Sequence, residues 1–238
     1  MLTAFAYSVN RIQNRICLTG GGRLKATHIE VPADISSAAF FMAGAAMTLG
    51  SELTLTQVGI NPTRIGVINI LRRMGAAITI SNEHQAGGEP VADISLSGGR
   101  LRGITIPADQ VPLAIDEFPA LFIAAACATG TTVLRGAAEL RVKESDRIQV
   151  MAEGLQQLGI EARATADGMI IQGGRLSGGT IHSQGDHRIA MAFAMAALGA
   201  DGPITIRDCA NVATSFPGFV ARAKQAGLGI RAEHGGHG

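Results

Sequence analysis

The chain alternates long apolar runs with short segments in which apolar and polar residues take turns. Three runs are rich in alanine and nearly free of charge: Asp34–Gly50, Asp116–Gly130 and Asp186–Gly199. They are apolar on almost every side, which predicts helices buried in a core. A short alternating segment follows each run, as in Leu53-Thr54-Leu55-Thr56. Such alternation predicts a half-buried strand.

A second helical segment follows each predicted strand, ends in glycine and leads into a β-type tail. These segments cover residues 65–74, 148–158 and 219–226. The first is amphipathic, with Ile68 and Leu71 on a different face from Arg72 and Arg73. The pattern as a whole predicts an α+β fold with sheets outside and alanine-rich helices inside.

The same order of elements recurs along the chain. Gly-Gly-Arg-Leu begins at residues 21, 98 and 173, so 77 and 75 residues separate the copies. This period is too long for a solenoid and predicts tandem copies of one αβ unit packed in a compact domain. Met1–Ala6 is similar to the end of a second helix, as in 70–75. We therefore expect the chain to begin inside a repeat and to be the carboxy-terminal portion of a longer protein.

Composition narrows the class of partner. Of the 238 residues 47% are apolar, enough for a large core, and 20 Lys and Arg balance 19 Asp and Glu. With one Tyr and no Trp, we expect a small-molecule partner and no nucleic acid. The uncharged stretches fall short of the roughly 20 residues that a bilayer span needs, so we expect no membrane partner. Cys17, Cys127 and Cys209 are widely spaced, which predicts buried free thiols in a reducing compartment and no zinc site.

The densest polar cluster is 139–147, Glu-Leu-Arg-Val-Lys-Glu-Ser-Asp-Arg, between a predicted strand and helix. One interpretation is that Ser145 or Asp146 caps the helix and the remaining charges are solvated. The equivalent loops of the other repeats can cap equally well with far fewer charges. Capping alone therefore does not explain Lys143, Glu144 and Arg147.

The three aspartates that open the alanine-rich runs have two interpretations. Each can be a simple N-cap, which we accept for Asp34. Alternatively, three similar helices direct their N-termini to one face, where anions are favoured. His187 and Arg188 lie just inside the third helix, and a cation there opposes the helix dipole unless an anion offsets it. The middle repeat also has five more residues before Asp116 than its counterparts, and this extra loop can shape a site.

Several of these motifs together resemble the 5-enolpyruvylshikimate-3-phosphate synthase family, the 3-phosphoshikimate 1-carboxyvinyltransferases. The motifs are Arg-Val-Lys-Glu-Ser-Asp-Arg (141–147), Gly-Asp-His-Arg-Ile-Ala-Met (185–191), Ile-Asp-Glu-Phe-Pro (115–119), Asn-Pro-Thr-Arg (61–64) and Thr-Ser-Phe-Pro-Gly-Phe (214–219). The resemblance covers the whole chain but only about the carboxy-terminal half of the family's enzyme. Its Lys-Ser and Gly-Asn-Ala-Gly-Thr segments are absent.

The resemblance implies a fold of two lobes, each of three βαβαββ units in an inverse α/β barrel-like domain, which is incomplete here. Residues 1–31 are then a remnant of the amino-terminal lobe, and residues 32–238 form the carboxy-terminal enolpyruvyl transferase lobe. The implied location is cytoplasmic. The missing amino-terminal half of the enzyme is an implied partner.

The implied reaction transfers the enolpyruvyl group of phosphoenolpyruvate to the 5-hydroxyl of shikimate 3-phosphate, without metal or organic cofactor. By matching motif positions, Asp116 and Glu144 are catalytic: the first deprotonates the hydroxyl and the second exchanges a proton with the methylene carbon. Lys143, Arg147, His187 and Arg188 are implied to bind substrate. Thr214 and Glu139 depart from a common family pattern of Lys and Asn and receive no role.

Three hypotheses follow. The chain is a synthase fragment that is inactive alone, a related enolpyruvyl transferase for a nucleotide sugar, or a binding module without catalysis. The 141–147 motif argues against the second. The presence of Asp116, Glu144, Arg147 and Arg188 argues against the third.

Overall fold

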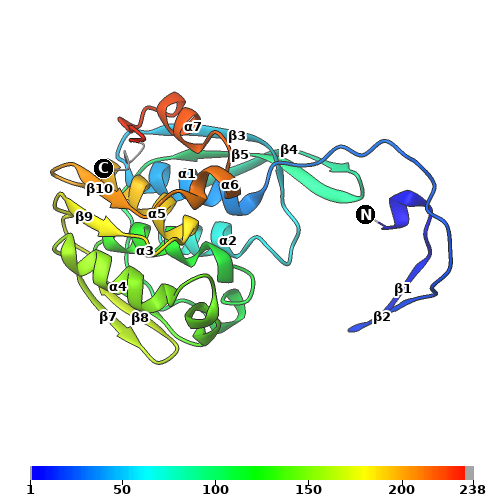
Figure 1. The fold of residues 1–238 in the computed structure, drawn as a ribbon, viewed down its shortest axis with the longest axis horizontal. Coiled ribbons are helices and arrows are strands. Elements are labelled where there is room, and N and C mark those ends of the chain that lie inside the picture. Colours follow the sequence, from blue (N-terminus) through cyan, green and yellow to red (C-terminus); the bar gives the residue numbers. More distant parts are fainter. Residues whose placement is uncertain (1, 234–238) are drawn as a thin grey trace, which may run out of the picture.

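The computed structural model describes residues 2–233; Met1 and residues 234–238 lie outside the described part. Three helices form the centre of the molecule (Figure 1). They are α1 (Ile35–Met47), α3 (Phe118–Ala126) and α5 (His187–Ala196), and they pack against one another. Every residue of α3 is buried. The prediction that the alanine-rich runs are core helices is confirmed.

Small sheets cover the outside of this helical centre. The first has the antiparallel order β3-β5-β4, formed by Glu52–Gly59, Glu89–Ser97 and Ala77–Ala86. The second repeats it as β6-β8-β7, formed by Thr131–Leu134, Gly168–Gln172 and Glu161–Thr165. In the third unit, β9 (Gly179–His182) pairs in parallel with β10 (Ile204–Arg207). The α+β class is therefore confirmed, with sheets outside and helices inside.

The second helix packs beside the sheet of its unit in the first two units, whereas in the third unit Phe219 of the second helix packs against Phe41 of α1. These helices are α2 (Gly66–Arg73), α4 (Arg147–Gln157) and α7 (Phe219–Gln225), and a short helix, α6 (Asn211–Ser215), precedes the last. Helix α2 packs against α3 and β4, and α4 packs against β7 and β9. In the first two units a parallel bridge, such as Ala33 with Val58, joins the chain before the central helix to the strand after it. The units thus share one connectivity.

The repeated Gly-Gly-Arg-Leu motif has a packing role in two of its copies. A Cβ added at Gly98 would lie 1.7 Å from the carbonyl oxygen of Thr48, and one added at Gly173 would lie 1.7 Å from that of Ala128. Both oxygens belong to the chain leaving a central helix. Only glycine permits so close a passage of two backbones.

The β-type tail predicted after the last helix is wrong for the third unit. Within residues 2–233, no strand follows α7. Leu228 is buried in the core instead, and its N–H donates to the carbonyl of Ala223 at 2.9 Å. The backbone thus turns against α7, and it does not extend along β10.

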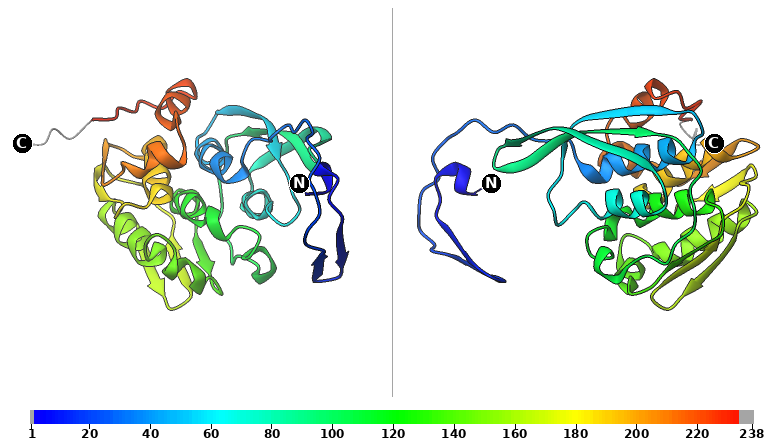
Figure 2. Two further views of the ribbon diagram at one scale, coloured as in Figure 1. Left: turned by 45° about the vertical axis from the view of Figure 1, so that its right-hand side comes forward. Right: turned by 180° about the vertical axis from the view of Figure 1, so that it is seen from behind.

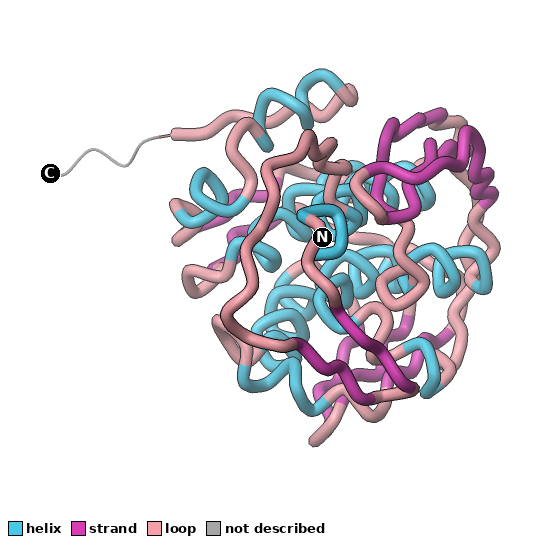
Figure 3. The backbone as a smooth tube through the Cα atoms, turned by 90° about the vertical axis from the view of Figure 1, so that its right-hand side faces the viewer, coloured by secondary structure: helices cyan, strands magenta, loops and turns pink. Residues whose placement is uncertain are grey.

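Residues 2–31, called the arm below, project away from the rest of the molecule (Figures 1 and 2). The arm contains a 3₁₀ turn at Leu2–Phe5 and an antiparallel hairpin of β1 (Val9–Ile12) and β2 (Arg15–Leu18). None of its residues is buried. In Figure 3 the arm passes in front of the helical body as a separate layer. Its exposed apolar side chains include Leu2, Ile12, Ile16, Leu18, Leu24 and Val31.

The prediction of buried cysteines is wrong at two positions. All three are free thiols, but Cys17 lies on the exposed hairpin of the arm, and Cys209 is exposed in the turn after β10. Cys127 follows α3 and is partly buried, and burial raises the pKa of its thiol to about 11. Among the described residues, no helix has both the length and the apolar character to cross a membrane.

Candidate active site

The first turns of α1 and α5 are capped as the sequence predicts. The carboxylate of Asp34 accepts a hydrogen bond from the Ser37 N–H at 2.8 Å. The carboxylate of Asp186 accepts one from the Arg188 N–H at 2.9 Å. Asp116 differs, because it lies in a 3₁₀ turn, Ile115–Glu117, and makes no side-chain bond to an N–H of α3. Capping therefore explains two of the three aspartates and is wrong for Asp116.

The five extra residues before Asp116 account for this difference. They belong to a loop that contains a 3₁₀ turn, Ala108–Gln110, and packs on the start of α2. The carbonyl of Leu113 accepts from the Gly66 N–H at 3.1 Å, and Gln110 Oε1 accepts from Asn69 Nδ2 at 2.9 Å. The chain therefore enters Asp116 from a loop that packs on α2, and Asp34 and Asp186 have no counterpart of this loop.

Three cations surround the carboxylate of Asp116. Lys143 Nζ lies 3.3 Å from Oδ1, Arg147 Nη1 lies 3.7 Å from Oδ1, and Arg188 Nη2 lies 4.0 Å from Oδ2. Burial raises the pKa of Asp116, but the charges of Arg188, Lys143 and Arg147 outweigh it and leave the pKa below its ordinary value. Residues from three distant motifs therefore meet at one carboxylate.

Arg147 is the most deeply buried of these cations, with a side chain 1% exposed. Its Nε donates to Asp186 Oδ2 at 2.8 Å, and its Nη2 donates to Glu144. Its Nη1 has no hydrogen-bond partner within the described residues. A buried donor without a partner is unfavourable, and an anion placed beside Asp116 would satisfy it.

The residues of the 139–147 cluster make different contacts. Asp146 caps α4 by accepting from the Gln149 N–H at 3.0 Å, as predicted for one of two candidates. Ser145, the other candidate, donates to Asp186 Oδ2 at 3.0 Å. Lys143 lies between Glu139 and Asp116, and the hydrogen bond to Glu139, followed by the charge of Asp116, raises the pKa of its ammonium. Only Asp146 is thus explained by capping.

Glu144 is the exposed acid of this cluster. Its side chain is 50% exposed and accepts a hydrogen bond from Arg147. Asp116 and Glu144 therefore contact the same guanidinium, one through Nη1 and the other through Nη2. This is an arrangement in which two carboxylates can serve one substrate.

A shallow hollow adjoins the cations at the first turns of α1 and α5. Its lining includes His187 and Arg188, and burial, followed by the charge of Arg188, lowers the pKa of His187. This shift favours the neutral imidazole. The other lining residues are Asp34, Ser36, Ser37, Phe40, Met191 and Ser215. Thr214, beside the last of these, is exposed on α6.

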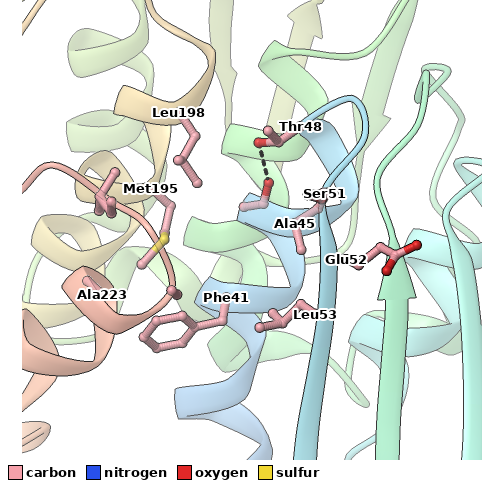
Figure 4. Close-up of a pocket in the computed structure, with 12 residues that line it drawn as sticks. Phe41, Ala45, Thr48, Ser51, Glu52, Leu53, Met195, Leu198 and Ala223 are labelled. Carbon is pink, nitrogen blue, oxygen red and sulfur yellow. Dashed lines mark hydrogen bonds between the residues drawn. The ribbon is translucent and has the colours of Figure 1, made fainter.

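A larger groove lies at the opposite end of α1 (Figure 4). Phe41, Leu53, Met195 and Leu198 give it an apolar lining, and Glu52 is its one charged lining residue. It lacks the paired acids and cations of the Asp116 cluster. We therefore take the first turns of the central helices as the candidate active site.

Three polar residues of the site received no role from the sequence. Glu117 is buried beside Ser36 and Arg64, and Ser36 Oγ donates to its carboxylate. Glu117 and Arg64 lie within motifs that carry the family resemblance, which was the available signal. Within residues 2–233, no group of three or more His, Cys, Asp or Glu side chains is placed to hold a metal ion.

Solved structures identify the fold as that of an enolpyruvyl transferase. EPSP synthase from Acinetobacter baumannii superposes with a TM-score of 0.94 and 60% identity, covering 98% of this chain and 54% of that one. The enolpyruvyl transferase NikO from Streptomyces tendae gives a TM-score of 0.75 at 19% identity, which is a likeness of fold alone.

Sequence comparison identifies the family. The model of the family EPSP synthase (3-phosphoshikimate 1-carboxyvinyltransferase) matches residues 1–222, and the chain belongs to this family. A 3-phosphoshikimate 1-carboxyvinyltransferase of Nitrosococcus oceani is 68% identical over 231 residues, 97% of this chain and 52% of the relative. That of Methylococcus capsulatus is 65% identical over 230 residues, with 97% and 53% covered. The chain thus spans about half the length of the curated relatives it matches.

Proposed function

We propose that the chain is the carboxy-terminal portion of a cytoplasmic enzyme that transfers the enolpyruvyl group of phosphoenolpyruvate to the 5-hydroxyl of shikimate 3-phosphate. The observation that carries this proposal is the meeting of Lys143, Arg147 and Arg188 around Asp116. A reaction between two anionic substrates needs such a concentration of positive charge. The family membership supplies the reaction.

The arginines bind phosphoenolpyruvate in this proposal. A guanidinium matches the geometry of carboxylate and phosphate oxygens better than an ammonium does. Among the described residues, Arg147 Nη1 is a buried donor without a partner, and Arg188 lies in the first turn of α5, where the helix dipole also favours an anion. His187 adjoins Arg188 as a neutral contact.

Two carboxylates divide the proton transfers. Asp116 orients the 5-hydroxyl and accepts its proton as the oxygen bonds to the second carbon of phosphoenolpyruvate. Glu144, in its protonated form, donates to the methylene carbon and then recovers a proton as the phosphate leaves, so that the double bond is restored. The proton taken by Asp116 leaves with the phosphate. Lys143, 3.3 Å from Asp116, contacts the acceptor and stabilises the developing charge.

The domain boundary is part of the same proposal. Residues 1–31 belong to the amino-terminal lobe and residues 32–238 to the carboxy-terminal lobe. Exposed apolar side chains such as Ile12 and Ile16, on an arm without a buried residue, are what a segment separated from its own lobe would have. Met1 and residues 234–238 of these ranges lie outside the described part.

The test measures phosphate release from phosphoenolpyruvate by the chain alone and by the complemented enzyme. The complemented enzyme is this chain joined to an amino-terminal half, for which the Nitrosococcus oceani relative is a suitable donor. We expect turnover with shikimate 3-phosphate only after complementation, because the other lobe is needed to close the site and exclude water.

Two results contradict the proposal. Turnover by the purified chain alone, proportional to its concentration and free of host enzyme, removes the need for a second lobe. A complemented enzyme that is folded yet releases phosphate with a nucleotide sugar, and not with shikimate 3-phosphate, assigns the chain to a different acceptor.

A further inference from the structure

A buried carboxylate lies behind the cations of the proposed site, and the reaction scheme does not use it. Glu117 follows Asp116 in the same 3₁₀ turn, and its side chain is 1% exposed. It is the N-cap residue of α3 but makes no side-chain bond to the helix. Helix capping therefore does not explain why an acid is buried here, where burial is unfavourable without partners.

The partners of Glu117 come from three other elements. Ser36 Oγ, in the first turn of α1, donates to Glu117 Oε1. Arg64, from the loop before α2, places Nη2 3.6 Å from the same oxygen and donates from Nη2 to Ser36 Oγ at 2.8 Å. Arg188 Nη1, on α5, lies 3.9 Å from Oε1. One carboxylate oxygen thus links all three central helices.

Arg188 is held between Glu117 and Asp116. Its Nη1 also donates to the backbone carbonyl of Asp116 at 3.0 Å, and its Nη2 lies 4.0 Å from the Asp116 carboxylate. Its side chain is 17% exposed, so Arg188 remains partly accessible to solvent. The orientation of a planar guanidinium decides whether it can bind an anion through two parallel hydrogen bonds.

We infer that Glu117 is a positioning residue that, together with Ser36 and Arg64, orients the Arg188 guanidinium toward the anionic group of phosphoenolpyruvate. The inference rests on the proposed function, because that function supplies the ligand of Arg188. Burial raises the pKa of Glu117, and Ser36, Arg64 and Arg188 oppose this effect. The charges of Arg64 and Arg188 thus both compensate the carboxylate, at 3.6 Å and 3.9 Å from its Oε1.

The variant Glu117→Gln in the complemented enzyme tests the inference. Glutamine keeps the size of the side chain and an oxygen that can accept from Ser36, but it removes the charge that faces Arg188. We expect the KM for phosphoenolpyruvate to rise about tenfold, with kcat within about threefold and the KM for shikimate 3-phosphate unchanged. The matched control is Glu153→Gln on the exposed face of α4, where the carboxylate accepts a hydrogen bond from Gln149 Nε2 at 2.8 Å.

The variant Arg64→Gln provides an independent test. It should raise the same KM by a smaller factor, and the double variant should exceed Glu117→Gln only slightly, because both act through one carboxylate. If Glu117→Gln fails to fold, Ser36→Ala replaces it, with an expected rise of about twofold in the same KM. An unchanged KM for phosphoenolpyruvate in these variants, or an equal rise in both substrate KM values, would overturn the inference.

A second readout separates this inference from the proposed function. The Nε–H resonance of Arg188 in the chain itself, assigned with Arg188→Lys, reports the surroundings of the guanidinium without any turnover. Glu117→Gln should shift this resonance, and Glu153→Gln should leave it in place. If the complemented wild type is inactive while the shift is seen, the proposed function fails and the positioning contact stands. A resonance that does not move in Glu117→Gln removes the positioning role.

Discussion

Asp34 and Asp116 occupy equivalent positions in the first and second units but do different work. Asp34 caps α1 and faces solvent, with its hydrogen bonds made to Ser37 of the same helix. Asp116 is withdrawn from α3 and faces Lys143, Arg147 and Arg188. A repeated position can therefore keep its residue type while the preceding loop changes its partners. The loop before Asp116 is five residues longer than the one before Asp34, and this is the local sequence difference that accompanies the change of partners.

The largest expected effect comes from removing the acids of the site in the complemented enzyme. Glu144→Gln should lower kcat by about 10²–10⁴-fold while substrate binding survives, because it removes the proton donor of the proposed mechanism and keeps the shape of the side chain. Asp116→Asn should lower kcat and also raise the KM for shikimate 3-phosphate. Steady-state kinetics corrected for the folded fraction measures both effects.

Asp34→Asn is the matched control, since asparagine caps a helix nearly as well as aspartate. Asp34 lines the hollow beside His187 and Arg188 but contacts none of the cations around Asp116, so the turnover of Asp34→Asn per folded molecule should fall far less than that of Asp116→Asn. Near-normal kcat in Glu144→Gln would remove that residue from the mechanism. A loss in Asp34→Asn as large as that in Asp116→Asn would abolish the distinction between the two positions.

A smaller effect is expected on stability at the third equivalent position. Asp186→Asn keeps the cap of α5 but breaks an ion pair with Arg147 in which both side chains are at most 1% exposed. Removing Asp186 leaves Arg147 compensated only by Glu144 and Asp116, so the free energy of unfolding should fall by about 2 kcal/mol, less than for an uncompensated buried charge. Urea unfolding of this chain measures it.

Asp34→Asn should lower the same free energy by less than about 1 kcal/mol. Equal losses at the two positions would mean that Asp186 is a cap and nothing more. The comparison requires that both variants keep the wild-type dependence on urea concentration, because a changed slope signals a changed unfolded state.

The smallest expected effect is a difference in pH dependence between two buried acids. Burial raises the pKa of Asp186, but the hydrogen bond and charge of Arg147 outweigh it, so the folded-state pKa is lowered. Its contribution to stability is thus present above about pH 4 and is lost as the pH falls through the folded-state pKa. Glu117 has a raised pKa, so its contribution is largest below about pH 4 and is lost as the pH rises through that pKa.

The free energy of unfolding of the wild type and of Glu117→Gln, measured between about pH 4 and pH 7, tests this difference. The wild type should lose stability relative to the variant as the pH rises, because only the wild type carries the buried acid. Parallel stability curves would show that Glu117 titrates in the folded chain as it does when unfolded.

Much of the fold could be predicted because the same order of apolar run, alternating segment and second helix recurs in each repeat. The alanine-rich runs marked α1, α3 and α5, and the motif at Gly98 and Gly173 recurs where two backbones pass closely. The third β-type tail could not be predicted, since Leu228-Gly229-Ile230 alternates like a strand but Leu228 is taken up by the core beside α7. The exposure of Cys17 could not be predicted, because its apolar neighbours Ile16 and Leu18 suggest burial but lie on the arm, where nothing covers them.

The site could be predicted in its members but not in its internal contacts. Sequence placed Asp116, Lys143, Glu144, Arg147 and Arg188 together through a family resemblance, and the structure brings these side chains into contact. Their roles remain proposals. The pairing of Arg147 with Asp186 and of Arg64 with Glu117 depends on how helices from different units pack. No local pattern in one segment carries that information.

The crowding of cations around Asp116 links ligand binding to proton uptake. An anion on Arg147 and Arg188 would offset the charges that hold the pKa of Asp116 low, and burial would then raise it. Each bound anion should therefore draw part of a proton onto this carboxylate, most visibly on the acidic side of neutrality. In the proposed mechanism, Asp116 would therefore be a better base once phosphoenolpyruvate is bound. Without a bound anion the same carboxylate has a lowered pKa and is a poor proton acceptor, so it stays ionised until an anion binds.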